Sequence, residues 1–122
     1  MRVLIVKPRE NPYEAEIESD LKSIQTIVGG RIEAVNPYKD RVVIICNADG
    51  KLLGLPMNRA VYDENGQVRD IVYGIFLVAG VSEDDFNSLT DDLVKKYSEL
   101  FWNPEQFALK DGKLYIIKIN QL

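Results

Sequence analysis

The segment from Asn47 to Arg59 gathers the side chains best suited to binding an anion. The candidate binding residues of this irregular segment, which contains two glycines and a proline, are Asn47, Lys51, Asn58 and Arg59. An Asn amide both donates and accepts hydrogen bonds, and the planar fork of Arg matches phosphate or carboxylate. Irregular segments carried by a rigid sheet are common binding sites. The pattern therefore predicts a ligand-binding site formed by these four residues.

The same segment has a second interpretation, in which its polar residues are purely structural. Asn side chains often serve turns, and Arg59 could pair with the carboxylate of Asp63 or Asp70. The sequence leaves both interpretations open, because only the fold decides whether these side chains meet at one cavity.

Acidic side chains gather in two stretches that contain no cation, residues 10–21 and residues 70–94. Such patches can dock on a basic protein surface, or they can be a solvated face with acids at the start of a helix, where they suit the helix dipole. Neither stretch has the spacing of a calcium loop, so we expect no metal site. The residues predicted to contact a partner are Asp84, Asp85, Asp91 and Asp92.

Several function classes are excluded by composition. The chain has no His, which removes Ser–His–Asp triads, Cys–His pairs and His metal sites. Its single cysteine, Cys46, lies in an apolar run and is expected in the core. With 15 Lys and Arg against 19 Asp and Glu, the net charge of −4 argues against general binding to a nucleic-acid backbone.

Cofactor-binding motifs are also missing from the sequence. There is no nucleoside-triphosphate loop and no dinucleotide fingerprint, and Gly29-Gly30 ends a helical pattern where a phosphate loop would open one. We therefore expect no cofactor and no catalytic residue. No apolar run approaches the roughly 20 residues of a membrane span, and no signal peptide is visible, so the cytoplasm is the expected location.

The elements that must position these residues follow from hydrophobic periodicity. Apolar residues recur at helical spacing over about 19–28 and 90–102, with Asp20 or Ser19 and Thr90 as N-caps. Between them lie many short strands, and the order is not a repeated strand–helix–strand unit. The sequence predicts an α+β fold, in which a mostly antiparallel sheet of short strands packs with two helices, and a single domain over residues 1–122.

The strand predictions include two hairpins, a short returning strand, an irregular segment and an acidic connection. Asn65-Gly66 and Asp111-Gly112 mark the hairpin turns. Residues 51–53 are expected to return from a turn as a strand, residues 55–59 to be irregular, and residues 82–88 to be an acidic connection. The expected strands are 3–6, 13–18, 32–35, 41–47, 61–62, 68–72, 74–81, 107–109 and 114–119.

The order of short motifs resembles a known family. The matching stretches, in chain order, are Met1-Arg2-Val3-Leu4-Ile5-Val6 with Pro8, Val28-Gly29-Gly30-Arg31-Ile32-Glu33, Cys46-Asn47 with Gly50-Lys51-Leu52, Gly54-Leu55-Pro56-Met57-Asn58-Arg59-Ala60, Asp70-Ile71-Val72-Tyr73-Gly74, and Phe86-Asn87-Ser88-Leu89-Thr90. They resemble the family of domain of unknown function 3846, whose members look like accessory proteins of bacterial phages and conjugative elements. The resemblance implies an accessory role in a mobile element and carries over no catalytic residue.

These observations favour binding over turnover. We expect a non-enzymatic protein of a phage or mobile element that counters a host defence system, in the host cytoplasm. It would sequester a small nucleotide signal or mask a host defence protein, and a homodimer is compatible with its many strand edges. The alternative is a structural or regulatory module of a conjugation or replication assembly. A third hypothesis is an enzyme that uses carboxylates, Lys or Tyr, which a deep pocket with two converging carboxylates would support.

Overall fold

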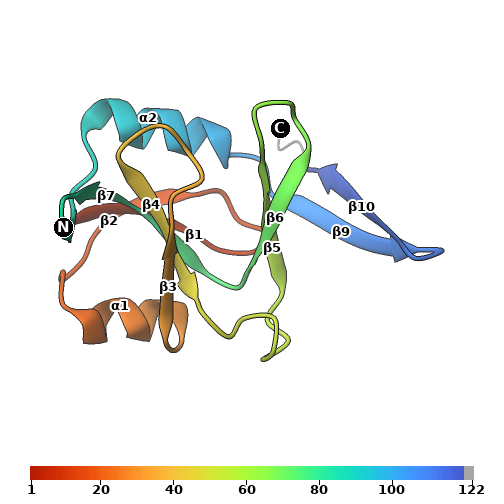
Figure 1. Ribbon diagram of the computed structural model, residues 1–122, viewed down its shortest axis with the longest axis horizontal. Coiled ribbons are helices and arrows are strands. Elements are labelled where there is room, and N and C mark those ends of the chain that lie inside the picture. Colours follow the sequence, from red (N-terminus) through yellow and green to blue (C-terminus); the bar gives the residue numbers. More distant parts are fainter. Residues whose placement is uncertain (120–122) are drawn as a thin grey trace.

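The computed structural model describes residues 1–119, which form ten strands and two helices (Figure 1). The α+β fold predicted from the sequence is confirmed, and every strand pair is antiparallel. The elements in order are β1 (Arg2–Val6), β2 (Tyr13–Glu16), α1 (Leu21–Val28), β3 (Ile32–Val35), β4 (Val42–Asn47), β5 (Met57–Tyr62), β6 (Val68–Tyr73), β7 (Phe76–Ser82), β8 (Asp85–Asn87), α2 (Asp91–Leu100), β9 (Glu105–Lys110) and β10 (Lys113–Lys118).

The central element is a six-stranded sheet in the order β2-β1-β7-β4-β3, with β8 added to the end of β7. Its three middle strands, β1, β7 and β4, have almost no exposed residue at their centres. Strands buried on both faces read as continuous apolar runs, because each successive side chain enters one core or the other.

The two helices cover opposite faces of this sheet (Figure 1). On β1, Val3 and Ile5 face α1, whereas Leu4 and Val6 face α2. The core on the α1 side also holds Ile24, Val28, Val43, Ile45, Leu77 and Ala79. The core on the α2 side also holds Val42, Ile44, Val61, Val72, Phe76, Val78, Leu89, Tyr97 and Phe101.

Both helices begin where the sequence predicted. The Asp20 carboxylate accepts a hydrogen bond from the backbone N–H of Ser23, and the Thr90 hydroxyl accepts one from Leu93. Gly29 ends α1 with a φ of 87°, a left-handed conformation that costs glycine nothing. The second helix ends at Leu100, two residues before the predicted end, and Phe101 follows it as the C-cap.

Three predicted segments differ from the structure. Residues 51–53 form turns and no strand, because both edges of β4 are already paired with β3 and β7. Residues 57–59, predicted as irregular, belong to β5, which pairs with β6 once Pro56 has been passed. The connection 82–88 contains β8, which folds back so that Asn87 lies opposite Gly80.

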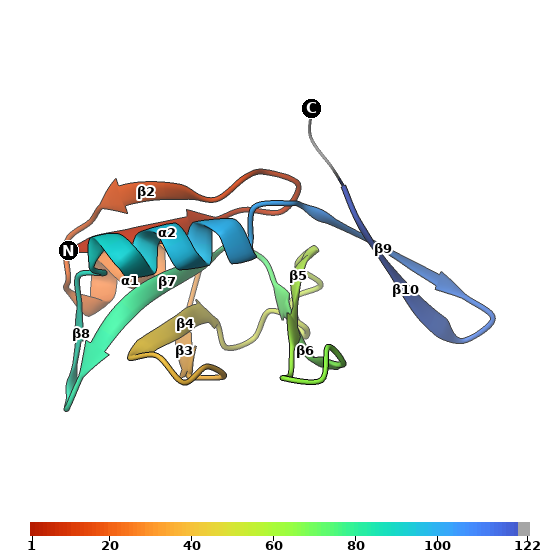
Figure 2. The ribbon, with the colours of Figure 1, turned by 90° about the horizontal axis from the view of Figure 1, so that it is seen from above.

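Two hairpins lie outside the main sheet. The hairpin of β5 and β6 packs Val61 and Val72 into the core on the α2 side. The hairpin of β9 and β10 follows α2 and extends away from the rest of the molecule (Figure 2). Both hairpins were predicted from their turn residues, and together they frame the region beside the end of α2.

Candidate functional site

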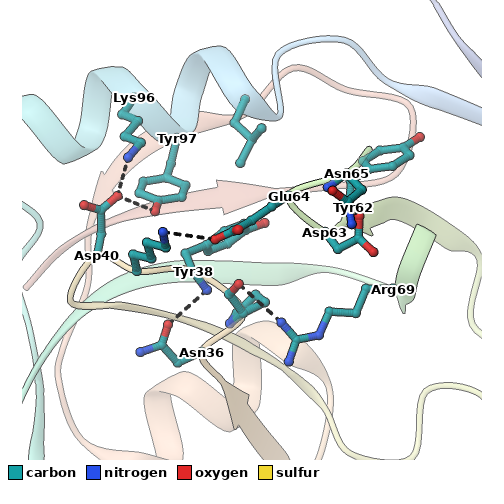
Figure 3. Close-up of a pocket in the computed structure, with 13 residues that line it drawn as sticks. Asn36, Tyr38, Asp40, Tyr62, Asp63, Glu64, Asn65, Arg69, Lys96 and Tyr97 are labelled. Atoms are coloured by element: carbon teal, nitrogen blue, oxygen red, sulfur yellow. Dashed lines mark hydrogen bonds and ion pairs between the residues drawn. The ribbon is translucent and has the colours of Figure 1, made fainter. Parts of the chain in front are cut away.

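A groove lies between α2, the connection from β3 to β4, and the turn between β5 and β6 (Figure 3). Its volume is about 770 Å³, within the range of small-molecule sites. The connection contributes residues 36–40, the β5–β6 hairpin contributes residues 62–65 and Arg69, and α2 contributes Lys96, Tyr97 and Leu100.

A carboxylate holds one end of the groove to α2. Asp40 accepts a hydrogen bond of 2.6 Å from the Lys96 ammonium and one of 2.7 Å from the Tyr97 hydroxyl. These two donors hold the pKa of the Asp40 carboxyl below its usual value. The charged carboxylate therefore fixes the β3–β4 connection against the helix and gives the groove a firm wall.

Aromatic rings form the inner wall. The Tyr38 and Tyr97 rings lie 5.1 Å apart at an angle of 52°, and Tyr97 is buried. Burial raises the pKa of both phenols above the usual value, so both stay protonated at neutral pH. Burial and a hydrogen bond to Glu105 raise the pKa of Tyr62 to about 12. The groove thus offers neutral aromatic surface on which a planar ligand could stack.

Two cations reach the open side of the groove. The Lys39 ammonium lies 3.1 Å from the Glu64 carboxylate, and both side chains are largely exposed. Exposed pairs of this kind contribute little stability and exchange partners easily. The Arg69 guanidinium makes only a long hydrogen bond of 3.4 Å to the Pro37 carbonyl, and no carboxylate of residues 1–119 forms an ion pair with it. Arg69 therefore presents donor capacity to a ligand.

The predicted ligand residues Asn58 and Arg59 lie elsewhere, in the interior beneath β5. Their exposures are 0% and 1%. The Asn58 amide donates to the carbonyls of Val6 and Gly74 at 2.9 and 2.8 Å, and its oxygen accepts from Arg59 at 2.8 Å. Asn58 therefore ties β5 to the ends of β1 and β6, and both N–H donors of its fully buried amide are used within the fold.

The Arg59 guanidinium is saturated by oxygen acceptors. It donates to Phe101 O from Nε at 3.1 Å and from Nη2 at 3.0 Å, to Glu10 O at 2.6 Å, and to the carbonyl of Asn58 at 3.2 Å. Burial lowers the pKa of this guanidinium, and the Glu105 charge opposes that effect. The expected pairing with Asp63 or Asp70 is absent from the ion pairs of residues 1–119. Arg59 joins α2, the β1–β2 loop and β5.

The other two predicted ligand residues occupy the turn after β4. The Asn47 amide donates to Val28 O at the end of α1, and its oxygen accepts from the backbone N–H of Asp49. The exposed Lys51 ammonium lies 5.6 Å from the centre of the Tyr73 ring. None of the four residues lines the groove, and only Asn58 and Arg59 touch each other. The structure thus supports the turn interpretation for Asn47.

The four predicted partner-binding acids are exposed and fall in two places. Asp84 and Asp85 lie at the turn between β7 and β8, and Asp91 and Asp92 lie in the first turn of α2. Asp91 forms a 2.7 Å ion pair with Arg2. The first helical turn is the position at which acids suit the helix dipole, so Asp91 and Asp92 also have a structural role.

The sequence did not reveal the groove, because its residues come from segments up to about sixty positions apart. The available signal was the polar and aromatic run Asn36-Pro37-Tyr38-Lys39-Asp40 between two strands, which lengthens a connection beyond what a turn needs. The buried carboxylate Glu105 was also missed. It accepts hydrogen bonds from Ala60 N and the Tyr62 hydroxyl, both at 2.8 Å.

Residues 1–119 contain no cluster of three or more potential metal-ligating side chains. Neither helix is long and apolar enough to cross a membrane. In the groove, Asp40 is bonded to Lys96, Glu64 to Lys39, and Asp63 to the backbone of its own turn. The arrangement is suited to holding a ligand by stacking and by ion pairing.

The fold and the groove define a small α+β protein in which two helices flank an antiparallel sheet and an open groove runs beside the second helix. The chain belongs to the family of domain of unknown function 3846, whose family model matches residues 1–102. The resemblance drawn from the sequence motifs is thereby confirmed. No curated protein and no solved structure matches the chain. The β9–β10 hairpin lies beyond the matched residues.

Proposed function

We propose that this protein is a non-enzymatic binding protein that takes a small nucleotide-type ligand in the groove beside α2. The observation that carries the proposal is Arg69, an exposed guanidinium without an ion-pair partner among the described residues, on the rim of a groove lined by Tyr38 and Tyr62. Guanidinium forks bind phosphate in bidentate fashion, and nucleobases stack on aromatic rings.

Lys39 gives the site a second cation for the same ligand. Its ammonium faces Glu64 across the mouth of the groove, in an exposed pair that a phosphate group could replace. The ligand then meets Lys39 and Arg69 at the rim, tyrosines on the inner wall, and the amides of Asn36 and Asn65. This chemistry fits an anion attached to a planar ring.

The proposed biological role follows from the accessory role that the family resemblance implies. A phage or mobile element would use such a protein in the host cytoplasm to counter a defence system, by sequestering the nucleotide signal on which that system depends. Sequestration requires affinity and abundance but no turnover, which agrees with a sequence that lacks His.

The test is a panel of mono-, di- and cyclic nucleotides screened by thermal shift and followed by calorimetry. A nucleotide that binds the folded chain raises the melting temperature, and the rise grows with the logarithm of nucleotide concentration above Kd. We expect Arg69→Ala to weaken binding by about tenfold or more, and Glu64→Gln to strengthen it because Lys39 is released. Arg31→Ala is the matched control, since Arg31 is an exposed arginine paired with Asp49 outside the groove.

No response to any nucleotide would sink the nucleotide version of the proposal. Equal losses in Arg69→Ala and Arg31→Ala would also count against it, because the effect would then come from net charge alone. The second candidate function is an interaction module of a conjugation or replication assembly, which the projecting β9–β10 hairpin favours. A pull-down that recovers proteins of the same element, with no nucleotide bound, would support that candidate.

A further inference from the structure

Asn65 differs from the other asparagines of the chain because a glycine follows it. Asparagine is a thermolabile residue, since the backbone nitrogen of the next residue can attack its side-chain carbonyl carbon. Glycine leaves that nitrogen accessible, because it has no Cβ. Gly66 has a φ of 77°, and an added Cβ at this position would meet no atom within 4 Å. The peptide between Asn65 and Gly66 therefore has the open surroundings that this attack requires.

The other asparagines of residues 1–119 are poorly placed for the same reaction. Asn47 and Asn58 are buried, and their amides donate hydrogen bonds within the fold. Asn87 is exposed, but it lies in a strand, β8, and a serine follows it. Three asparagines precede a proline, whose nitrogen carries no hydrogen: Asn11, Asn36 and Asn103. Among the described residues, Asn65 alone combines exposure with a following glycine.

The β5–β6 turn holds Asn65 in solvent. Residues 63–70 are all exposed, and the side chain of Asn65 makes no hydrogen bond within residues 1–119. The Gly66 N–H donates to the Asp63 carbonyl at 3.0 Å, so the attack requires this hydrogen bond to open. Exposed turns open locally at a small cost in free energy. The folded chain therefore gives the Gly66 nitrogen repeated access to the Asn65 side chain.

The position of Asn65 connects this reaction to the groove. Asn65 lines the groove, and its neighbour Glu64 lies 3.1 Å from the Lys39 ammonium (Figure 3). A carboxylate at position 65 would add a negative charge to the wall that carries Glu64, opposite the cations Lys39 and Arg69. The effect of this charge on a bound nucleotide rests on the proposed function, whereas the reaction itself does not.

We propose that Asn65-Gly66 is a site of spontaneous deamidation, which adds a negative charge to the rim of the groove. The Gly66 nitrogen forms a bond to the Asn65 side-chain carbonyl carbon, and the bond from that carbon to the amide nitrogen breaks. The amide nitrogen leaves as ammonia and takes the proton of the Gly66 N–H. Water then opens the succinimide ring at either of its carbonyls and leaves aspartate or isoaspartate at position 65. The reaction consumes only water, so the modified fraction grows with the age of the protein.

The test is peptide mapping by mass spectrometry after the folded chain has been incubated in a mildly alkaline buffer. We expect the mass shift from amide to acid to appear first at Asn65, as two products that separate by chromatography. Asn87 is the internal control, because it is also exposed but precedes a serine. Gly66→Ala is expected to slow the reaction, since its methyl group hinders the attacking nitrogen, and circular dichroism reports whether this variant keeps its fold.

Three results would overturn the proposal. The first is conversion of Asn87 as fast as that of Asn65, and the second is an unchanged rate in Gly66→Ala. The third is an Asn65 amide that persists in the folded chain while guanidinium-unfolded chain is converted at the same position, because the native turn would then protect it.

The effect on the groove is tested separately with Asn65→Asp, which carries the added charge from the start. The probe is adenosine diphosphate, and we expect its affinity to fall by about fivefold, the size of one exposed charge interaction. Asn87→Asp is the matched control, since it adds the same charge outside the groove. Wild-type affinity in Asn65→Asp, or an equal loss in Asn87→Asp, overturns this effect. If no nucleotide binds the wild-type chain, the proposed function fails, while the mass shift still decides whether Asn65 is modified.

Discussion

Arg59 is the residue on which the most contacts depend. Its five N–H groups all meet oxygen acceptors, and replacing it with an apolar side chain leaves the buried carbonyl of Phe101 and the part-buried carbonyl of Glu10 without these donors. An unsatisfied buried polar group costs about 1–3 kcal/mol. Arg59 therefore stabilises the fold mainly through the hydrogen bonds that it donates, and its positive charge contributes less.

We predict that Arg59→Met lowers the free energy of unfolding by about 3 kcal/mol or more, because several acceptors lose their donor at once. Urea denaturation measures this change. Arg69→Met is the control: Arg69 is exposed on β6, so the expected loss is within about 0.5 kcal/mol. Similar losses in the two variants would contradict a structural role specific to Arg59.

Asp40 makes the wall of the groove sensitive to acid. Its carboxyl has a pKa below the unfolded value of 3.8, because Lys96 and Tyr97 donate to the charged form. A lowered folded-state pKa means that the contribution is complete above the unfolded value and is lost as pH falls through the folded value. We predict that Asp40→Asn destabilises the chain at pH 7 and that wild type and variant converge as the pH falls below 3.8 and through the lowered pKa of Asp40. Thermal unfolding of both chains between pH 7 and acid measures this difference in stability. A difference that does not change with pH would contradict a stabilising role for the charged Asp40 carboxylate.

At the scale of elements, the close packing of β8 on β7 depends on one glycine. A Cβ at Gly80 would lie 2.9 Å from Ser88 O and 3.0 Å from Asn87 O, so the backbone itself stands in the way. We predict that Gly80→Ala costs about 1–3 kcal/mol through overpacking. Gly66→Ala is the comparison: its Cβ meets no atom within 4 Å, and only the φ of 77° opposes it, at about 1 kcal/mol. Chemical denaturation of both variants measures the difference, and a Gly80→Ala loss no larger than that of Gly66→Ala would argue against the backbone clash.

The elements most accessible to prediction were those with a local signal. Asp20 and Thr90 marked the helix starts through capping chemistry, and the Asn-Gly and Asp-Gly turns marked both hairpins. The strand predictions that were wrong concern segments whose structure depends on pairing with strands distant in the sequence. Residues 51–53 include two apolar leucines but find no free edge on β4, because β3 and β7 already pair with it, whereas β8 forms by pairing with β7. Strand pairing depends on tertiary contacts, so the local sequence pattern does not determine it.

At the scale of the whole molecule, the body and the projecting hairpin meet at Glu105. This buried carboxylate satisfies Ala60 N and the Tyr62 hydroxyl. We predict that a chain ending after Gln106 unfolds with a free energy within about 1 kcal/mol of the full chain when both are compared as monomers. A chain ending after Trp102 loses Glu105 and about 2 kcal/mol or more. Circular dichroism during denaturation compares the three, and equal stability of the two truncated chains would show that Glu105 is dispensable.

The candidate site illustrates the limit of sequence reasoning at this scale. Polar side chains in an irregular segment were the right chemistry to look for, yet burial assigned Asn58 and Arg59 to the interior and Asn47 to a turn. The residues that line the groove come from three separate elements: Arg69 from the β5–β6 hairpin, Tyr38 from the β3–β4 connection and Lys96 from α2. Such residues become neighbours only through the packing of α2 against the sheet, which no spacing in the sequence encodes.

The saturated guanidinium of Arg59 also has a consequence for the order of folding. Its acceptors lie 49 residues before it, at Glu10, and 42 residues after it, at Phe101. The cation can leave water only when all three segments have come together, so we expect its contacts to form after the folding transition state. Weakening them should accelerate unfolding while leaving the refolding rate nearly unchanged. Unfolding rates of Arg59→Met and wild type, measured by stopped flow, would test this expectation, and a variant that slows refolding with unchanged unfolding would contradict it.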